Sequence, residues 1–131
     1  MKQKILLFTL IPFFLVACFS HKDEKLCTMI YVTIGISVKD TLNNPVVLEK
    51  YEVKVVNTNQ LLPVHSDSAS MAQGLYTLLT DSEISSISEH GTTLRFNGYK
   101  DSQIIVTGDY IVNQDGCHVN LISGSETLIV K

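Results

Sequence analysis

Most of the chain after residue 28 alternates between apolar and polar positions with a period of two. The clearest run spans residues 32–38, where Val and Ile alternate with Thr, Gly and Ser. Successive side chains of a strand point to opposite faces, so this pattern predicts a strand with one buried face. Similar strand-like runs recur at 46–56, 74–79, 92–99, 103–112, 117–122 and 127–130.

Turn-forming residues separate these runs. Asp, Asn, Pro and Gly gather at 40–45, 57–59, 100–102 and 113–116, where they favour chain reversal. About seven short strands at this spacing predict a mostly β fold, an antiparallel sandwich. Residues 60–73 are the least regular part, and we expect Ser66–Ser70 to be a polar loop.

One short helix is predicted at residues 81–90. Thr80 can serve as its N-cap, with Glu83 three positions on as the partner in a capping box. Two isoleucines three apart would share one face, and Gly91 would end the helix. A helix of this length is marginal alone, so it must pack on the sandwich.

The first seventeen residues have the pattern of a secretory signal. Met1-Lys2-Gln3-Lys4 is basic, and Ile5–Ala17 is almost wholly apolar. A membrane-spanning helix needs about 20 apolar residues, which this run does not supply. The segment is therefore predicted to be a signal peptide and not a membrane anchor.

Leu15-Val16-Ala17-Cys18 resembles the lipobox of bacterial lipoproteins. The resemblance implies cleavage before Cys18 and attachment of lipid to its sulfur, with several acyl chains giving a stable anchor. Residues 18–27 would then be a lipidated tether and 28–131 a single domain. The alternative is an ordinary secretory signal in which the cysteine is incidental.

The tether carries Lys22-Asp23-Glu24, which is similar to the charged export tag of some surface lipoproteins in Bacteroidetes. The resemblance implies an outer-membrane lipoprotein displayed on the cell surface. Charge runs are also common in solvated tethers, and that alternative leaves the protein facing the periplasm.

Composition excludes some partners. Loss of the signal would leave about 114 residues, enough for one domain, and would move the net charge from −3 to about −5. A single arginine, Arg95, gives no basic surface for nucleic acid. Membrane contact is expected through the lipid alone.

Two further cysteines, Cys27 and Cys117, would lie beyond the inner membrane. Oxidising conditions there favour a disulfide, which we expect to join the first strand to a late one. Two free buried thiols are the alternative. A metal site is disfavoured because the cysteines and histidines lack the close spacing of zinc ligands.

Several short motifs occur in the order found in carboxypeptidase-regulatory-like domains. Val38-Lys39-Asp40 followed by Asn43-Asn44-Pro45-Val46 resembles their opening hairpin, with Asn44 in place of a turn glycine. Gly74-Leu75-Tyr76 and Leu94–Tyr99 are similar to later strands. Residues 116–119 (Gly-Cys-His-Val) are also similar to the ending of small Bacteroidetes lipoproteins. The resemblance covers roughly residues 30–110 and implies a prealbumin-like, transthyretin-like sandwich, whereas function does not follow from such a fold.

The sequence offers little catalytic chemistry and no cofactor motif. Of the histidines His21, His65, His90 and His118, only His118 adjoins a cysteine, and strand alternation would place the two on opposite faces. No serine lies in a Gly-x-Ser-x-Gly elbow. Carboxylates lie singly on predicted turns, without the spacing of a calcium loop.

Two triplets resemble a site of Bacteroidetes O-glycosylation, Asp40-Thr41-Leu42 and Asp67-Ser68-Ala69. The resemblance implies that Thr41 and Ser68 are modified.

Three functions remain open. The leading hypothesis is a non-catalytic envelope module that binds a partner protein or glycan through loops or a sheet edge. A small hydrolase using a loop Asp with His65 or His118 is the alternative from another class, and a structural spacer without a ligand is the third.

Overall fold

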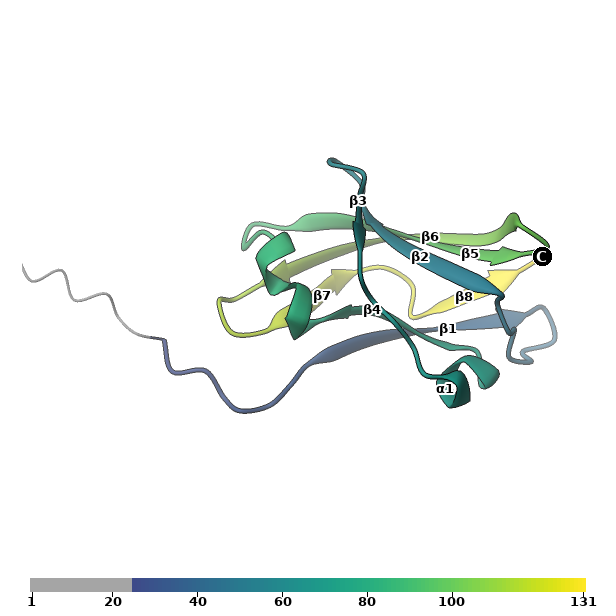
Figure 1. The fold of residues 1–131 in the computed structure, drawn as a ribbon, viewed down its shortest axis with the longest axis horizontal. Helices are drawn as coiled ribbons and strands as arrows, with labels where there is room; N and C mark the ends of the chain where they lie inside the picture. The colour runs from purple at the N-terminus through teal and green to yellow at the C-terminus, as the bar shows by residue number, and fades with distance from the viewer. Residues whose placement is uncertain (1–24) are drawn as a thin grey trace, which may run out of the picture.

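The computed structural model describes residues 25–131 and consists of two β-sheets packed face to face (Figure 1). The eight strands are β1 (Thr33–Asp40), β2 (Lys50–Val55), β3 (Gln60–Leu62), β4 (Leu75–Thr80), β5 (Thr92–Lys100), β6 (Gln103–Gln114), β7 (Val119–Ser123) and β8 (Thr127–Val130). A three-stranded sheet has the order β4-β1-β8, and a five-stranded sheet has the order β3-β2-β5-β6-β7. The predicted β-sandwich is confirmed.

One pairing departs from the antiparallel pattern. β8 lies parallel to β1, from Ser37 opposite Thr127 to Asp40 opposite Val130, while the other pairings are antiparallel. β3 lies within residues 60–73, the part of the chain predicted to be the least regular. Its three residues pair with Val53–Val55 of β2.

The two sheets enclose one apolar core. Tyr76 of β4 and Phe96 of β5 are buried, with ring centroids 6.0 Å apart, and Tyr51 of β2 stacks on Phe96 at 5.5 Å. The buried phenol of Tyr76 donates to the carbonyl of Val46 at 2.9 Å and accepts from the amide of Leu48 at 2.8 Å. Buried hydroxyls need such partners, and these two bonds fix the approach to β2.

A short helix is present where one was predicted, but it is shorter than the expected range of 81–90. The capping box is present, since Thr80 N donates to Glu83 Oε2 at 3.0 Å, but the element is a 3₁₀ helix, η1 (Asp81–Ser86). Residues three apart eclipse one another in a 3₁₀ helix, which suits the isoleucine spacing. η1 ends at Ser86 because Ile87 turns into an extended conformation and is buried. Gly91 therefore does not end the helix.

A second helix, α1 (Ser68–Ala72), replaces the expected polar loop. Asp67 is its N-cap: its Oδ1 accepts from the amides of Ala69 at 3.0 Å and Ser70 at 2.9 Å. The capping residue was visible in the sequence, but the segment has too few apolar residues to show a helical period.

One turn detail also differs from expectation. The left-handed residue of the β1–β2 turn is Asn43, at φ 68°, and not Asn44. Asp40 explains the shift, because its Oδ1 accepts from the amides of Leu42 and Asn44, both at 2.8 Å.

No helix among residues 25–131 is long and apolar enough to cross a bilayer.

Candidate functional site

The five-stranded sheet has an incomplete edge. On one side, Lys50, Tyr51 and Glu52 of β2 pair with β5. On the other side β3 covers only Val53–Val55. Pro63 follows β3 and has no amide hydrogen to continue the ladder, so no strand of the described chain covers the first half of β2 on this side.

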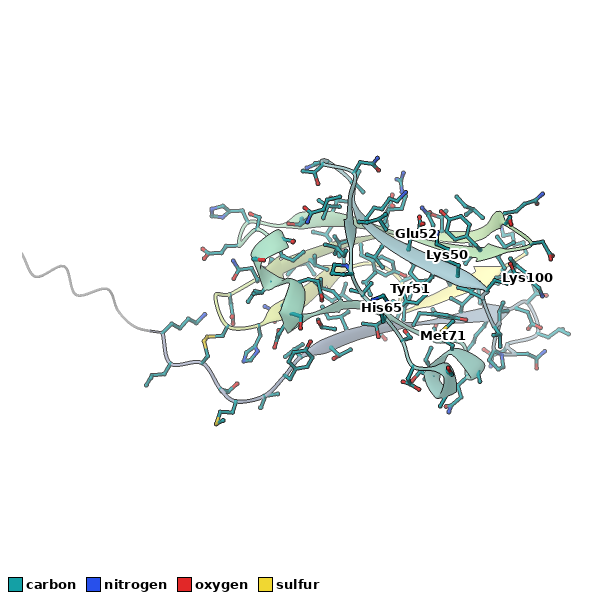
Figure 2. The ribbon with its side chains drawn as sticks, in the orientation of Figure 1. Lys50, Tyr51, Glu52, His65, Met71 and Lys100 are labelled. Atoms are coloured by element: carbon teal, nitrogen blue, oxygen red, sulfur yellow. A yellow bond between two sulfur atoms is a disulfide. The ribbon has the colours of Figure 1, made fainter. Side chains whose placement is uncertain are left out.

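A groove of about 430 Å³ lies along this open half of β2. We call it the edge groove; its lining includes Lys50, Tyr51, Glu52, Leu61, His65 and Met71. Figure 2 shows the labelled side chains among these on one side of the molecule, where the chain crosses between the sheets. The lining combines an apolar floor with charged and polar groups at the rim, as is common in binding sites.

The phenol of Tyr51 fixes one wall of the edge groove. Its hydroxyl lies 2.9 Å from Ser66 Oγ, which in turn accepts from the amide of Thr77 on β4 at 2.7 Å. Burial raises the pKa of Tyr51, so the group stays a neutral phenol at physiological pH. Ser66 also occupies the edge of β4, which protects that strand from further pairing.

The charged side chains at the rim form ion pairs with one another. Glu52 contacts Lys50, lies 3.4 Å from Lys54 Nζ and accepts from the hydroxyl of Tyr99 at 3.0 Å. The hydrogen bond from Lys50 is the largest cause that lowers the pKa of Glu52. The carboxylate is therefore compensated, and the groove presents the Lys50–Glu52 ion pair beside an apolar wall.

A second cluster joins His118 to Asp81. His118 Nδ1 lies 2.8 Å from Asp81 Oδ2, and His118 Nε2 lies 2.8 Å from Thr28 Oγ1. Asp81 also accepts from the amides of Val32 at 2.8 Å and Val119 at 2.9 Å. Burial alone would raise the pKa of Asp81, but these hydrogen bonds outweigh it and lower the pKa.

The order hydroxyl–imidazole–carboxylate in this cluster is that of a hydrolase triad. All four of these side-chain bonds of Asp81 and His118 nevertheless connect structural elements, namely the segment before β1, η1, the turn before β7 and the first residue of β7. Four grooves of the described chain, the edge groove among them, do not have Thr28, Asp81 or His118 in their lining. The arrangement can brace this end of the sandwich, and it can polarise Thr28.

The Cys27–Cys117 disulfide is present, with Cα atoms 5.3 Å apart. It does not join two strands as expected, because Cys27 precedes β1 and Cys117 lies in the turn between β6 and β7. His118 also precedes β7, so the argument from opposite strand faces does not apply. Cys117 is excluded from a Cys–His dyad because its sulfur is in the disulfide.

The loop carboxylates have local structural roles. Asp115 accepts from the amides of Cys117 and His118, and these bonds lower its pKa to about 2. Asp109, which lies on β6 and not in a loop, forms two hydrogen bonds with Arg95 of β5, at 2.7 and 2.8 Å. No group of three or more His, Cys, Asp or Glu side chains within residues 25–131 could hold a metal ion.

The remaining predicted site residues are not brought together. Thr41 and Ser68 are both exposed, and each follows an aspartate whose side chain accepts backbone amides of the next residues. His65 is exposed at the edge groove and His90 is exposed on a turn. Cys18, His21 and the Lys22-Asp23-Glu24 tag lie outside the described residues. The edge groove was missed because it depends on where β3 stops pairing.

No family model, curated protein or solved structure matches the chain, so the family resemblance stays a prediction.

Proposed function

We propose that this protein is a lipid-anchored cell-envelope module that binds an extended segment of a partner polypeptide along the edge groove. The observation that supports this is the open half of β2, where three consecutive residues pair with β5 on one side and lack a strand neighbour on the other, beside a groove of about 430 Å³. An added strand would satisfy the backbone of β2, and its alternate side chains would enter the groove. Lipid on Cys18 would hold the module at the outer membrane, on the surface or facing the periplasm.

The chemistry of the edge groove indicates the partner segment. Apolar contacts are offered by Leu61, Tyr51 and the half-buried Met71. Lys50 lines the groove, and Lys54 on the same strand lies 3.4 Å from Glu52. These two lysines share the single carboxylate of Glu52, which leaves a net positive charge here. We therefore expect an extended segment with apolar residues at alternate positions and an acidic group nearby.

Photo-crosslinking in intact cells tests the proposal. A photoreactive amino acid at position 61 would lie at the rim of the edge groove, where Leu61 is 53% exposed. The matched control is position 122 on β7, at the opposite edge of the same sheet, where Ile122 is 57% exposed. We expect a partner adduct from position 61 and not from position 122, with the crosslinked peptide mapped by mass spectrometry.

A pair of neighbouring substitutions sharpens the test. Met71→Glu places a charge in the edge groove, whereas Ala72→Glu places it on an exposed position of the same helix. The first is expected to abolish the adduct and the second to leave it. Because Met71 packs against the core, circular dichroism first establishes that both variants are folded at the temperature of the assay. Equal adducts from positions 61 and 122 would contradict the proposal. Absence of any adduct would favour the spacer hypothesis.

The Thr28–His118–Asp81 cluster supports a second candidate, a hydrolase with Thr28 as nucleophile and His118 as its general base. A fluorophosphonate probe would label Thr28 and not the His118→Ala variant if this activity exists. Absence of labelling in the intact wild-type protein would leave the cluster with its bracing role alone.

A further inference from the structure

Large apolar side chains are exposed close together just before β1. Leu26 is 95% exposed and Met29 fully exposed, and Ile30 and Tyr31 are 68% and 60% exposed. Other exposed apolar residues of the described chain are spread over strands and turns. We call residues 26–31 the apolar collar. Scattered apolar side chains need no explanation, but a contiguous group indicates a contact surface.

The apolar collar is attached to the sandwich by a disulfide and by side-chain hydrogen bonds. Cys27 is bonded to Cys117, and Thr28 Oγ1 lies 2.8 Å from His118 Nε2. The hydroxyl of Tyr31 lies 2.7 Å from Thr80 Oγ1 and 2.6 Å from Ser82 Oγ. These bonds hold the backbone in place while leaving Leu26, Met29 and Ile30 outside the core. Their exposure is therefore a fixed property of this end of the molecule.

The position of the collar in the chain identifies what covers it. Cys18 precedes Cys27 by nine residues, and an extended chain reaches at most about 3.6 Å per residue. A lipid on Cys18 therefore confines Cys27, near the start of the collar, to within about 30 Å of the bilayer surface. Aliphatic side chains followed by a tyrosine also suit the boundary between acyl chains and headgroups.

We propose that the apolar collar contacts the lipid bilayer, so that the disulfide end of the sandwich stands on the membrane. This proposal rests on the lipid anchor of the proposed function. The collar would add a second membrane contact, which would fix the orientation of the sandwich relative to the bilayer. In Figure 1 the collar enters at one end of the sandwich, whereas the β1–β2 turn lies at the other end. The sandwich would then project its β1–β2 and β5–β6 turns away from the membrane.

Single-tryptophan variants test the orientation, because the chain contains no tryptophan. Met29→Trp reports on the collar, and Leu42→Trp reports on the β1–β2 turn, where Leu42 is 79% exposed. The full lipidated protein is reconstituted in phosphatidylcholine vesicles with and without brominated acyl chains. Interfacial side chains lie about 5–10 Å into the headgroup–acyl boundary, so bromine should remove at least about half of the Met29→Trp emission. The Leu42→Trp emission should be unchanged.

The intact mass of the reconstituted protein separates the two proposals. A lipidated chain whose Met29→Trp emission is unquenched would overturn the bilayer contact and leave the anchor standing. Equal quenching of both variants would also overturn it, because the sandwich would then lie flat. A blue shift without quenching would show that protein, such as a second copy, covers the collar. An unlipidated chain would overturn the anchor and this inference with it.

Discussion

Asp81 is expected to stabilise one end of the sandwich through a single carboxylate. It accepts from the amides of Val32 and Val119 and from His118 Nδ1, and its side chain is only 12% exposed. Asp81→Ala leaves both amides without these acceptors. A buried donor without a partner costs about 1–3 kcal/mol, so the expected loss is about 2–4 kcal/mol in the free energy of unfolding.

Urea unfolding followed by far-UV circular dichroism measures this loss, with the urea slope expected to stay unchanged. The matched control is Asp109→Ala, which removes a carboxylate paired with Arg95 in a half-exposed ion pair. Exposed pairs contribute about 0–1 kcal/mol. The reasoning about Asp81 would be refuted if its replacement cost no more than that of Asp109.

The same contribution depends on pH with a defined sign. Hydrogen bonds lower the pKa of Asp81 below its ordinary value of 3.8 against the opposing effect of burial. A carboxyl group with a depressed folded-state pKa stabilises the fold above its unfolded pKa. The difference between wild type and Asp81→Ala should therefore be constant near neutral pH and shrink as pH falls below about 4.

Three further predictions concern the turns and the crosslink. Gly74→Ala should cost several kcal/mol by urea unfolding, since Gly74 has φ +68° and a Cβ there would lie 2.6 Å from the carbonyl oxygen of Val38; a loss below about 1 kcal/mol would contradict this. Replacing Cys27 and Cys117 together by Ser opens a loop with a sequence separation of 90 and should cost about 4–5 kcal/mol on the chain-entropy model, while wild type under reductant should match the variant. Asp115→Asn should remove a stability contribution that is full above pH 4 and lost as pH falls towards the folded pKa of about 2; an unchanged acid-unfolding midpoint would count against it.

Strands could be predicted because each buries one face, which leaves a period of two in the sequence. β1 shows this directly, with Ile36 and Val38 buried and Ser37 between them only partly so. The parallel placement of β8 could not be predicted, because its four residues have the same pattern whichever strand they pair with. The 3₁₀ type of η1 could not be predicted, because isoleucines three apart fit both an α-helix and a 3₁₀ helix.

The candidate sites depend on juxtapositions that no local pattern records. His118 meets Asp81 across 37 positions of sequence, and its partner Thr28 lies in a segment that is not a strand. The edge groove depends on pairing that ends at Leu62, for which Pro63 was the one visible signal. The pairing of Cys27 with Cys117 could be predicted from composition, but the elements that the disulfide joins could not be predicted.

The two proposed contacts use different parts of one sandwich, and this has a consequence for how they act together. Lys50 begins β2 opposite Tyr99, close to the β5–β6 turn, and Figure 2 places Lys50 near Lys100. The open half of β2 therefore lies towards the end that would face away from the membrane, while the apolar collar lies at the other end. Since the disulfide and Asp81 fix the collar without involving β2 or β3, changes in the collar should leave the edge groove intact. Met29→Trp should accordingly retain the crosslink from position 61, whereas a loss of that crosslink would mean that the partner also touches the collar.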